Sequence, residues 1–341
     1  MDRRTASLVI LAVVLCAIIV LGEVFTYGIN VHSFDSDAKF SSGTLDYSVS
    51  SSGSDTYSVV LIDDNGVEPI NDLYIFVDEK YDDHYNELPV KSNFEYINQQ
   101  SYSEQIERHL EMRGFKEVTL LKSKGLIQFI NETWENPKGH GLFITSYELP
   151  TEIYKGEASD LLMKWISNGG HLYWSSSEIG KYHVDEDGLH EVTGNQALFF
   201  GKECVNTGDT QNATGTIGND FRTALTLQDS GLRFALNISE IPDSLAVGYC
   251  DDGYSSISFV KHGNGMICVI GTMREIIQQI EDTAQIIASG LTYASEIVDY
   301  DKGNVVRGTV KGNMDCSSVT GVRAYIYIGG TYTLYGRCYC V

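Results

Sequence analysis

The sequence predicts an α/β protein whose main domain is a doubly wound, flavodoxin-like, mostly parallel sheet. Three observations predict it. Leu73–Val77 is a continuous apolar run, typical of a parallel strand that is buried on both faces. Residues 142–178 have the pattern of a strand, an amphipathic helix and a second strand, with Gly169-Gly170 before the second strand. Strands and helices alternate from residue 72 to residue 297, as in an open sheet covered by helices on both sides.

The helices of this domain are marked by their caps and their apolar faces. Ser101-x-x-Glu104 is a capping box, and we expect the helix that it begins to end at Gly114. Thr272-x-x-Glu275 is a second capping box, before the last helix. Further helices are expected at 126–130 and 156–168, and further strands at 117–121, 142–146, 171–174, 245–249, 256–261 and 266–270, the last two joined by a hairpin turn.

Two β-rich segments flank this domain. Alternating residues at 44–49 and 56–62 predict a small β-hairpin. Residues 298–341 predict three strands and no helix. Because a β-sandwich has about seven strands, we expect this segment either to pack on its neighbour or to begin a truncated sandwich. The predicted organisation is an anchor at 1–28, a hairpin and linker at 29–66, the α/β domain at 67–297 and a β-rich segment at 298–341.

The N-terminus predicts a membrane anchor. Arg3 and Arg4 precede an apolar run from Ala6 to Gly22, which would span about 25 Å as a helix. Basic residues before such a helix stay on the cytoplasmic side. We therefore expect a single-pass cell-membrane protein whose bulk is extracytoplasmic, and a cleaved signal peptide is the alternative.

The charge and the remaining motifs agree with an external location. The net charge is −22, and phosphate binding needs a basic surface, so the sequence excludes nucleic acid as a partner. Glycosylation sequons begin at Asn131, Asn212 and Asn237. Cysteines outside the predicted anchor allow up to three disulfides, in pairings that the sequence leaves open; they are Cys204, Cys250, Cys268, Cys316, Cys338 and Cys340.

The segment Leu161-Leu-Met-Lys-Trp-Ile-Ser-Asn-Gly-Gly-His-Leu-Tyr-Trp174 resembles the class I glutamine amidotransferase-like superfamily, in its non-amidotransferase branches. Residues 263–271 and the following helix also resemble it, and the similarity covers about 70–295. The superfamily's amidotransferases carry a cysteine at a strand-to-helix elbow, where this chain has Ser175-Ser-Ser177 without flanking glycines. The resemblance therefore implies a catalytically degenerate domain. Residues 298–341 are faintly similar to a carboxypeptidase-regulatory-like domain.

Polar residues follow two strands of the predicted sheet at their carboxyl ends. Asp78 and Glu79 follow the strand at 73–77, and Ser175 and Glu178 follow the strand at 171–174. In an open α/β sheet, ligands bind beyond the carboxyl ends of the strands. We therefore expect these four residues to bind a ligand.

A divalent cation is a weaker hypothesis, and no other cofactor is expected. Asp185-x-Asp187-Gly188 resembles part of a calcium loop. His183 and Gly194, however, stand where an EF-hand needs acidic residues. The other interpretation is that Asp185 and Asp187 are solvated loop residues of an acidic protein.

The leading functional hypothesis is an extracytoplasmic binding protein, with a glycan or an envelope protein as its ligand. The alternative is a hydrolase acting on an external sugar or ester. In it, Ser176 is the nucleophile, His183 or His190 is the base, and Glu178 or Asp185 orients the base. A third hypothesis is an accessory subunit of a transport system.

Overall fold

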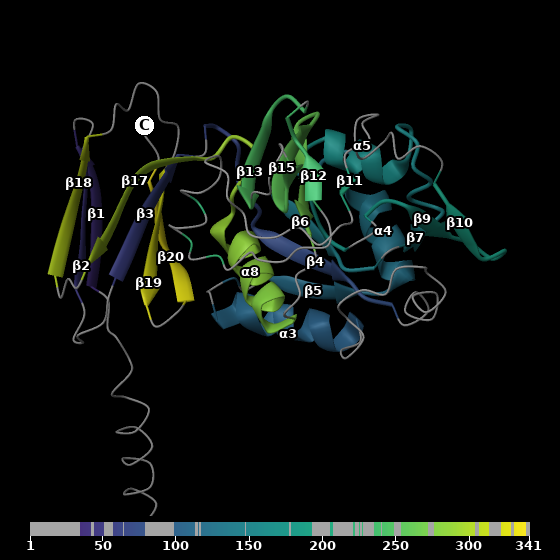
Figure 1. Ribbon diagram of the computed structural model, residues 1–341, viewed down its shortest axis with the longest axis horizontal. Helices are drawn as coiled ribbons and strands as arrows, with labels where there is room; N and C mark the ends of the chain where they lie inside the picture. Colours follow the sequence, from purple (N-terminus) through teal and green to yellow (C-terminus); the bar gives the residue numbers. More distant parts are fainter. Residues whose placement is uncertain are drawn as a thin grey trace, which may run out of the picture.

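Figure 1 shows the computed structural model of the chain. The structure describes residues 35–41, 44–50, 57–63, 65–78, 99–112, 115, 117–146, 148–176, 179–192, 205–206, 221, 225, 227, 235–239, 241–248, 254–271, 276–303, 307–313, 322–328 and 331–338.

The centre of the protein is a seven-stranded, mostly parallel sheet (Figure 1). In order across the sheet its strands are β13 (Ser244–Gly248), β15 (Ile257–His262), β16 (Gly265–Ile270), β8 (His171–Ser175), β6 (His140–Ile144), β4 (Asp72–Phe76) and β5 (Val118–Leu121). The strands from β16 to β5 are parallel, whereas β15 and β13 extend the sheet antiparallel at one edge. The predicted α/β architecture with a mostly parallel sheet is confirmed.

Helices cover both faces of this sheet and enclose two hydrophobic cores. α3 (Gln99–Met112) and α8 (Ile276–Ser289) pack on one face, and α4 (Ser123–Thr133) and α5 (Leu161–Ser167) pack on the other. The predicted inner face of α3 is confirmed, because Tyr102, Ile106 and Leu110 have no exposed surface. β8 is buried along its whole length, which explains its apolar sequence.

α5 is shorter than the helix predicted at 156–168. Asp160 explains the difference, because its Oδ2 accepts the backbone N–H groups of Lys155 (2.7 Å) and Glu157 (2.9 Å). These bonds hold the preceding residues in turns, so the helix begins only after Asp160. Gly169 follows the helix with φ +124°, a backbone conformation that favours glycine.

The flanking strands form two further sheets, and the predicted hairpin is wrong. β2 (Thr44–Ser50) and β3 (Tyr57–Asp63) do not pair with each other. β2 lies between β1 (Asp35–Ser41) and β18 (Arg307–Asn313). β3 lies in a four-stranded sheet with β17 (Glu296–Gly303), β19 (Val322–Ile328) and β20 (Thr331–Cys338).

Both ends of the chain therefore build one β-rich part beside the α/β domain (Figure 1). Its two sheets together contain the seven strands that a β-sandwich needs. β20 contacts α8 of the neighbouring domain. The predicted domain boundaries stay a prediction.

Two small sheets lie outside the seven-stranded sheet and consist of strands of two or three residues each. One consists of β7 (Glu148–Pro150), β9 (Tyr182–Val184) and β10 (Leu189–Glu191). The other consists of β11 (Val205–Asn206), β12 (Ala235–Asn237) and β14 (Tyr254–Ser255). Such short strands carry too little alternation to be predicted from sequence.

The predicted membrane partner requires a correction. Within the described ranges, the chain forms no helix that has both the length and the apolar character needed to cross a bilayer. The predicted anchor, residues 1–28, lies outside the described residues. Cys268 in β16 is a buried free thiol, so it takes part in none of the disulfides that the six cysteines allow.

Candidate functional site

The residues predicted to bind a ligand at the end of β4 have a structural role or lie outside the described chain. Asp78 is half-buried, and its Oδ2 accepts the backbone N–H of Ser123 at 2.8 Å. Ser123 is the first residue of α4, whose early N–H groups have no partner inside the helix. Asp78 thus caps α4, and Glu79 is not among the described residues.

Side chains of α3 and α8 cover the carboxyl end of β8. Ser175 and Ser176 have no exposed surface. Gln279 of α8 donates a hydrogen bond from Nε2 to the Ser175 hydroxyl at 2.9 Å. The Tyr102 hydroxyl lies 3.4 Å from Thr283 Oγ1, and burial raises the pKa of Tyr102 to about 12. A substrate cannot reach Ser176 in this arrangement; Ser177 and Glu178 lie outside the described residues.

A half-exposed cluster of four polar side chains lies on the small sheet β7-β9-β10. We call it the Thr151 cluster; its members are Thr151, His183, Asp185 and His190. The Thr151 hydroxyl lies 2.7 Å from His183 Nδ1. The His183 and His190 rings are stacked, with centroids 5.0 Å apart and an interplanar angle of 21°. His190 Nε2 lies 2.8 Å from Asp185 Oδ1.

Strand pairing brings these residues together. β9 and β10 are antiparallel with His183 opposite His190, so the two rings project from the same face of the sheet. β7 runs parallel to β9, and the Thr151 backbone N–H donates to the Val184 carbonyl at 3.0 Å. That bond holds Thr151, the first residue after β7, beside His183.

The turn between β9 and β10 depends on Asp185. Its backbone N–H donates to the Gly188 carbonyl at 3.2 Å, and its Oδ1 accepts the Asp187 N–H at 2.8 Å. Asp185 Oδ1 therefore contacts both the backbone of the turn and the His190 ring. Among the residues that the structure describes, no group of three histidine, cysteine, aspartate or glutamate side chains is placed to hold a metal ion. Asp185 and Asp187 are thus turn residues.

The electrostatics of the Thr151 cluster favour a neutral imidazole at His183. Burial, and then the neighbouring charge of His190, lower the pKa of His183 below its ordinary value. Hydrogen bonds from His190 and from the Asp187 backbone lower the pKa of Asp185, so its carboxylate stays ionised. A neutral His183 with Nδ1 toward a hydroxyl can accept that hydroxyl's proton.

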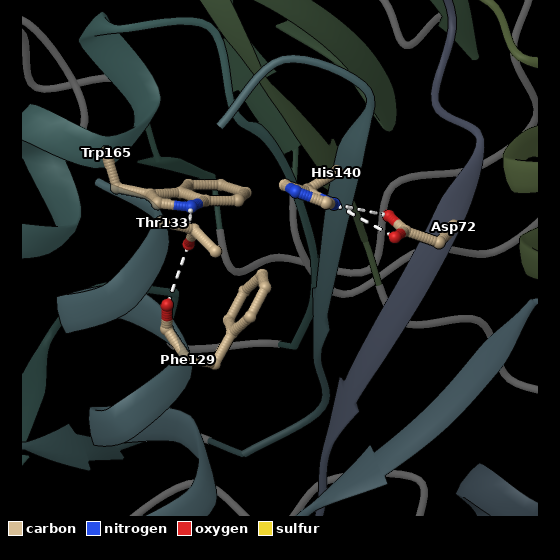
Figure 2. Close-up of polar contacts among 5 residues, drawn as sticks. All are labelled: Asp72, Phe129, Thr133, His140 and Trp165. Atoms are coloured by element: carbon tan, nitrogen blue, oxygen red, sulfur yellow. Dashed lines mark hydrogen bonds and ion pairs between the residues drawn. The ribbon is translucent and has the colours of Figure 1, made fainter. Parts of the chain in front are cut away.

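A second histidine–aspartate pair, His140 and Asp72, lies at the amino ends of β6 and β4 in the seven-stranded sheet (Figure 2). His140 Nδ1 lies 2.7 Å from Asp72 Oδ1, and the two residues begin β6 and β4. The His140 and Phe129 rings are nearly perpendicular, with an interplanar angle of 79° and centroids 5.9 Å apart. Burial, and then the Asp72 charge, raise the pKa of Tyr74 nearby. This pair joins the amino ends of two strands, away from the carboxyl ends where α/β proteins bind ligands.

Two of the three sequons lie in described parts of the chain. Asn131 is an exposed residue of α4, and Asn237 is the half-buried last residue of β12. Asn212 lies outside the described residues.

No protein-family model and no curated protein sequence matches the chain. Several solved structures resemble part of it. A catalytic mutant of a GH42 β-galactosidase from G. stearothermophilus is 14% identical, with a TM-score of 0.39 over 65% of this chain and 30% of that chain. A cold-adapted β-galactosidase from Rahnella sp. is 12% identical, with a TM-score of 0.40 over 64% and 31%. An exo-β-1,4-mannosidase from an Opitutaceae bacterium is 11% identical, with a TM-score of 0.33 over 64% and 35%.

These comparisons correct the predicted family. The chain spans about a third of the length of the structures that it resembles, and these are galactosidases and a mannosidase. The predicted resemblance to the class I glutamine amidotransferase-like superfamily is corrected: no family model matches the chain, and the solved structures that resemble part of it are described as β-galactosidases and a mannosidase. The catalytically degenerate binding protein that rested on this resemblance is withdrawn with it, together with its glycan or envelope-protein partner, which no comparison shows. At these TM-scores, the likeness carries no argument about what the chain does.

Proposed function

We propose that the chain is a hydrolase of carboxylic esters, with Thr151 as the nucleophile and His183 as the general base. The observation that carries the proposal is the 2.7 Å contact between the Thr151 hydroxyl and His183 Nδ1, at a half-exposed position. A hydroxyl is a weak nucleophile at neutral pH unless an adjacent base accepts its proton. In the described chain, Ser176 is buried and Thr151 is half-exposed.

The proposed reaction has two steps. Thr151 Oγ1 attacks the carbonyl carbon while His183 Nδ1 accepts the hydroxyl proton; the alcohol then leaves with that proton. Water afterwards attacks the acyl-threonine and gives a proton to His183. The bond between Thr151 Oγ1 and the acyl carbon breaks, the acid leaves, and His183 returns that proton to Oγ1, which restores the threonine and the neutral base. Lys155 is close enough to lower the pKa of His183, and its positive charge would stabilise the anionic tetrahedral intermediate.

Asp185 and His190 position the base in this proposal. Asp185 Oδ1 fixes the His190 ring through their 2.8 Å contact, and that ring is stacked on His183. The stack restricts rotation of His183 and keeps Nδ1 toward Thr151. His190 also lowers the pKa of His183, which keeps the base neutral.

The Thr151 cluster is less suited to hydrolysis of a glycosidic bond than to hydrolysis of an ester. That reaction needs one carboxylic acid whose pKa is raised beside one ionised carboxylate. In the Thr151 cluster the only carboxylate is Asp185, and its pKa is lowered. Aryl galactosides and mannosides nevertheless belong in the assay, because cleavage of them would contradict the ester chemistry.

The test is hydrolysis of p-nitrophenyl acetate and of acetylated sugars by the full chain in detergent. Thr151→Ala should lower kcat/KM about 10²–10⁴-fold, whereas Thr151→Ser keeps a hydroxyl and should retain activity. Ser176→Ala, the matched control, should leave kcat/KM unchanged. Activity that survives in Thr151→Ala but is lost in Ser176→Ala would overturn the proposal.

The acid side of the pH profile gives an independent check. Because the pKa of His183 is lowered, the base stays neutral below the ordinary histidine value of about 6.5. We expect kcat/KM to hold level through that pH and to fall only in stronger acid. In His190→Phe the second charge is gone while a ring remains to stack. The pKa of His183 should rise, so the fall should begin at higher pH.

A further inference from the structure

Asparagine glycosylation requires two side chains of the sequon at once. The asparagine amide nitrogen forms a bond to the anomeric carbon of a glycosyl phosphate donor. The bond from that carbon to phosphate oxygen breaks, the phosphate leaves with the electron pair, and the amide nitrogen loses one proton. The sequon also needs the hydroxyl two residues later. A transferase that acts on the folded protein must therefore reach the amide and the hydroxyl from the same side.

In the sequon at Asn131, the helix α4 holds the asparagine and the threonine side chains apart. Residues i and i+2 of an α-helix do not face each other, so Asn131 and Thr133 project to different sides of α4. The Thr133 hydroxyl donates to the Phe129 carbonyl at 2.7 Å and accepts a hydrogen bond from Trp165 Nε1 at 3.0 Å (Figure 2). Trp165 has no exposed surface, so this hydroxyl points into the core. The Asn131 amide, in contrast, is on the exposed side and donates to the Ile127 carbonyl at 2.8 Å.

The sequon at Asn237 has its two side chains in contact. Asn237 Oδ1 accepts a hydrogen bond from the Ser239 hydroxyl at 2.6 Å and another from the Ser239 backbone N–H at 3.1 Å. Ser239 is exposed, whereas the intervening Ile238 packs against the core. Within the described chain, the Asn237 amide nitrogen makes no hydrogen bond and is available to react. The apolar contact of Ile238 turns the neighbouring polar side chains outward.

We propose that Asn237 is a glycosylation site of the folded protein and that Asn131 is not. Both sequons satisfy the same sequence rule, so only their three-dimensional geometry distinguishes them. The proposal is independent of the hydrolase function and concerns a different sheet, that of β11, β12 and β14.

Mass spectrometry of peptides from the full chain, purified from the cells that naturally make it, tests the proposal. We expect a glycan on the peptide that contains Asn237 and the unmodified mass for the peptide that contains Asn131. Ser239→Ala should reduce occupancy of Asn237 at least tenfold, and Ser239→Thr should restore it. Thr133→Ser, which keeps the sequon in the helix, should leave Asn131 unmodified.

Two outcomes would overturn the proposal. A glycan on Asn131 would mean that the transferase acts before α4 forms, so the folded geometry would not select the site. An unmodified Asn237 in the protein from its natural cells would show that Asn237 is not a glycosylation site. A thermal melt of Ser239→Ala should match that of the parent protein, which separates loss of the sequon from loss of the fold.

Discussion

Replacing Gly170 by alanine should destabilise the protein, because the added methyl group collides with Trp165. An ideal Cβ at Gly170 would lie 2.3 to 2.5 Å from three carbons of the indole ring, whereas carbon atoms pack at about 3.5–4.0 Å. The ring cannot move aside freely. It is fully buried, its Nε1 donates to Thr133, and Phe129 packs edge-on with centroids 5.9 Å apart. The ring or the backbone must therefore shift by roughly 1 Å or more.

Overpacking of this kind costs about 1–3 kcal/mol. Loss of a glycine from the unfolded chain returns about 0.4–1 kcal/mol, which leaves a net loss of about 0.6–2 kcal/mol in the free energy of unfolding. For a domain of this size each kcal/mol lowers Tm by about 2–4 °C, so a thermal melt should show a drop of roughly 1–8 °C. Gly125→Ala is the control: its Cβ would meet Leu121 Cδ2 at 3.3 Å, and alanine favours the interior of α4 by about 1 kcal/mol. A Gly170→Ala protein as stable as the parent would refute the reasoning, and Trp165→Leu should suppress the loss if the indole is its cause.

Three further substitutions test other parts of the structure. Tyr154→Phe removes the hydroxyl that donates to the buried Gly180 carbonyl at 2.6 Å, and should cost about 1–3 kcal/mol in urea denaturation. Asp78→Ala removes the cap on the Ser123 N–H and should cost about 0.5–2 kcal/mol, with unchanged ester hydrolysis; a loss of activity alone would instead make Asp78 a site residue. Burial lowers the pKa of His262, so the unfolded chain binds more protons and the free energy of unfolding should fall as pH drops below about 6.5. His262→Asn should flatten that decline between pH 7.5 and 5; an unaltered slope would assign it to other groups.

The α/β part of the fold was predictable because its signals are local. The apolar face of α3 depends on spacing along one helix, and the apolar run of β4 depends only on burial. The predicted capping box is wrong as the start of this helix, because α3 begins at Gln99 and Ser101 lies inside it. α5 was predicted too long because Asp160 takes the backbone N–H groups of two preceding residues. A helical pattern in the sequence does not show that a side chain competes for those groups.

The pairing of β2 and β3 could not be predicted from the same kind of signal. The two strands are close in sequence and both alternate, which favours a hairpin. Their partners, however, come from residues 296–338, so each joins a different sheet. Alternation shows that a strand has one face to bury, but it does not identify the strand beside it.

The histidines of the Thr151 cluster were predictable as a group, whereas the proposed nucleophile, Thr151, was not. His183, His190 and Asp185 lie within one short segment, so a single hypothesis grouped them. Thr151 joins them only because β7 pairs with β9, a contact between distant residues made by strands of three residues each. The rule that ligands bind at the carboxyl ends of strands directed attention to Ser176, yet Gln279 of α8 bonds to the adjacent serine and closes that end. A comparison of Thr151→Ala with Ser176→Ala therefore tests a physical distinction, between a hydroxyl that a substrate can contact and one that it can reach only if α8 moves.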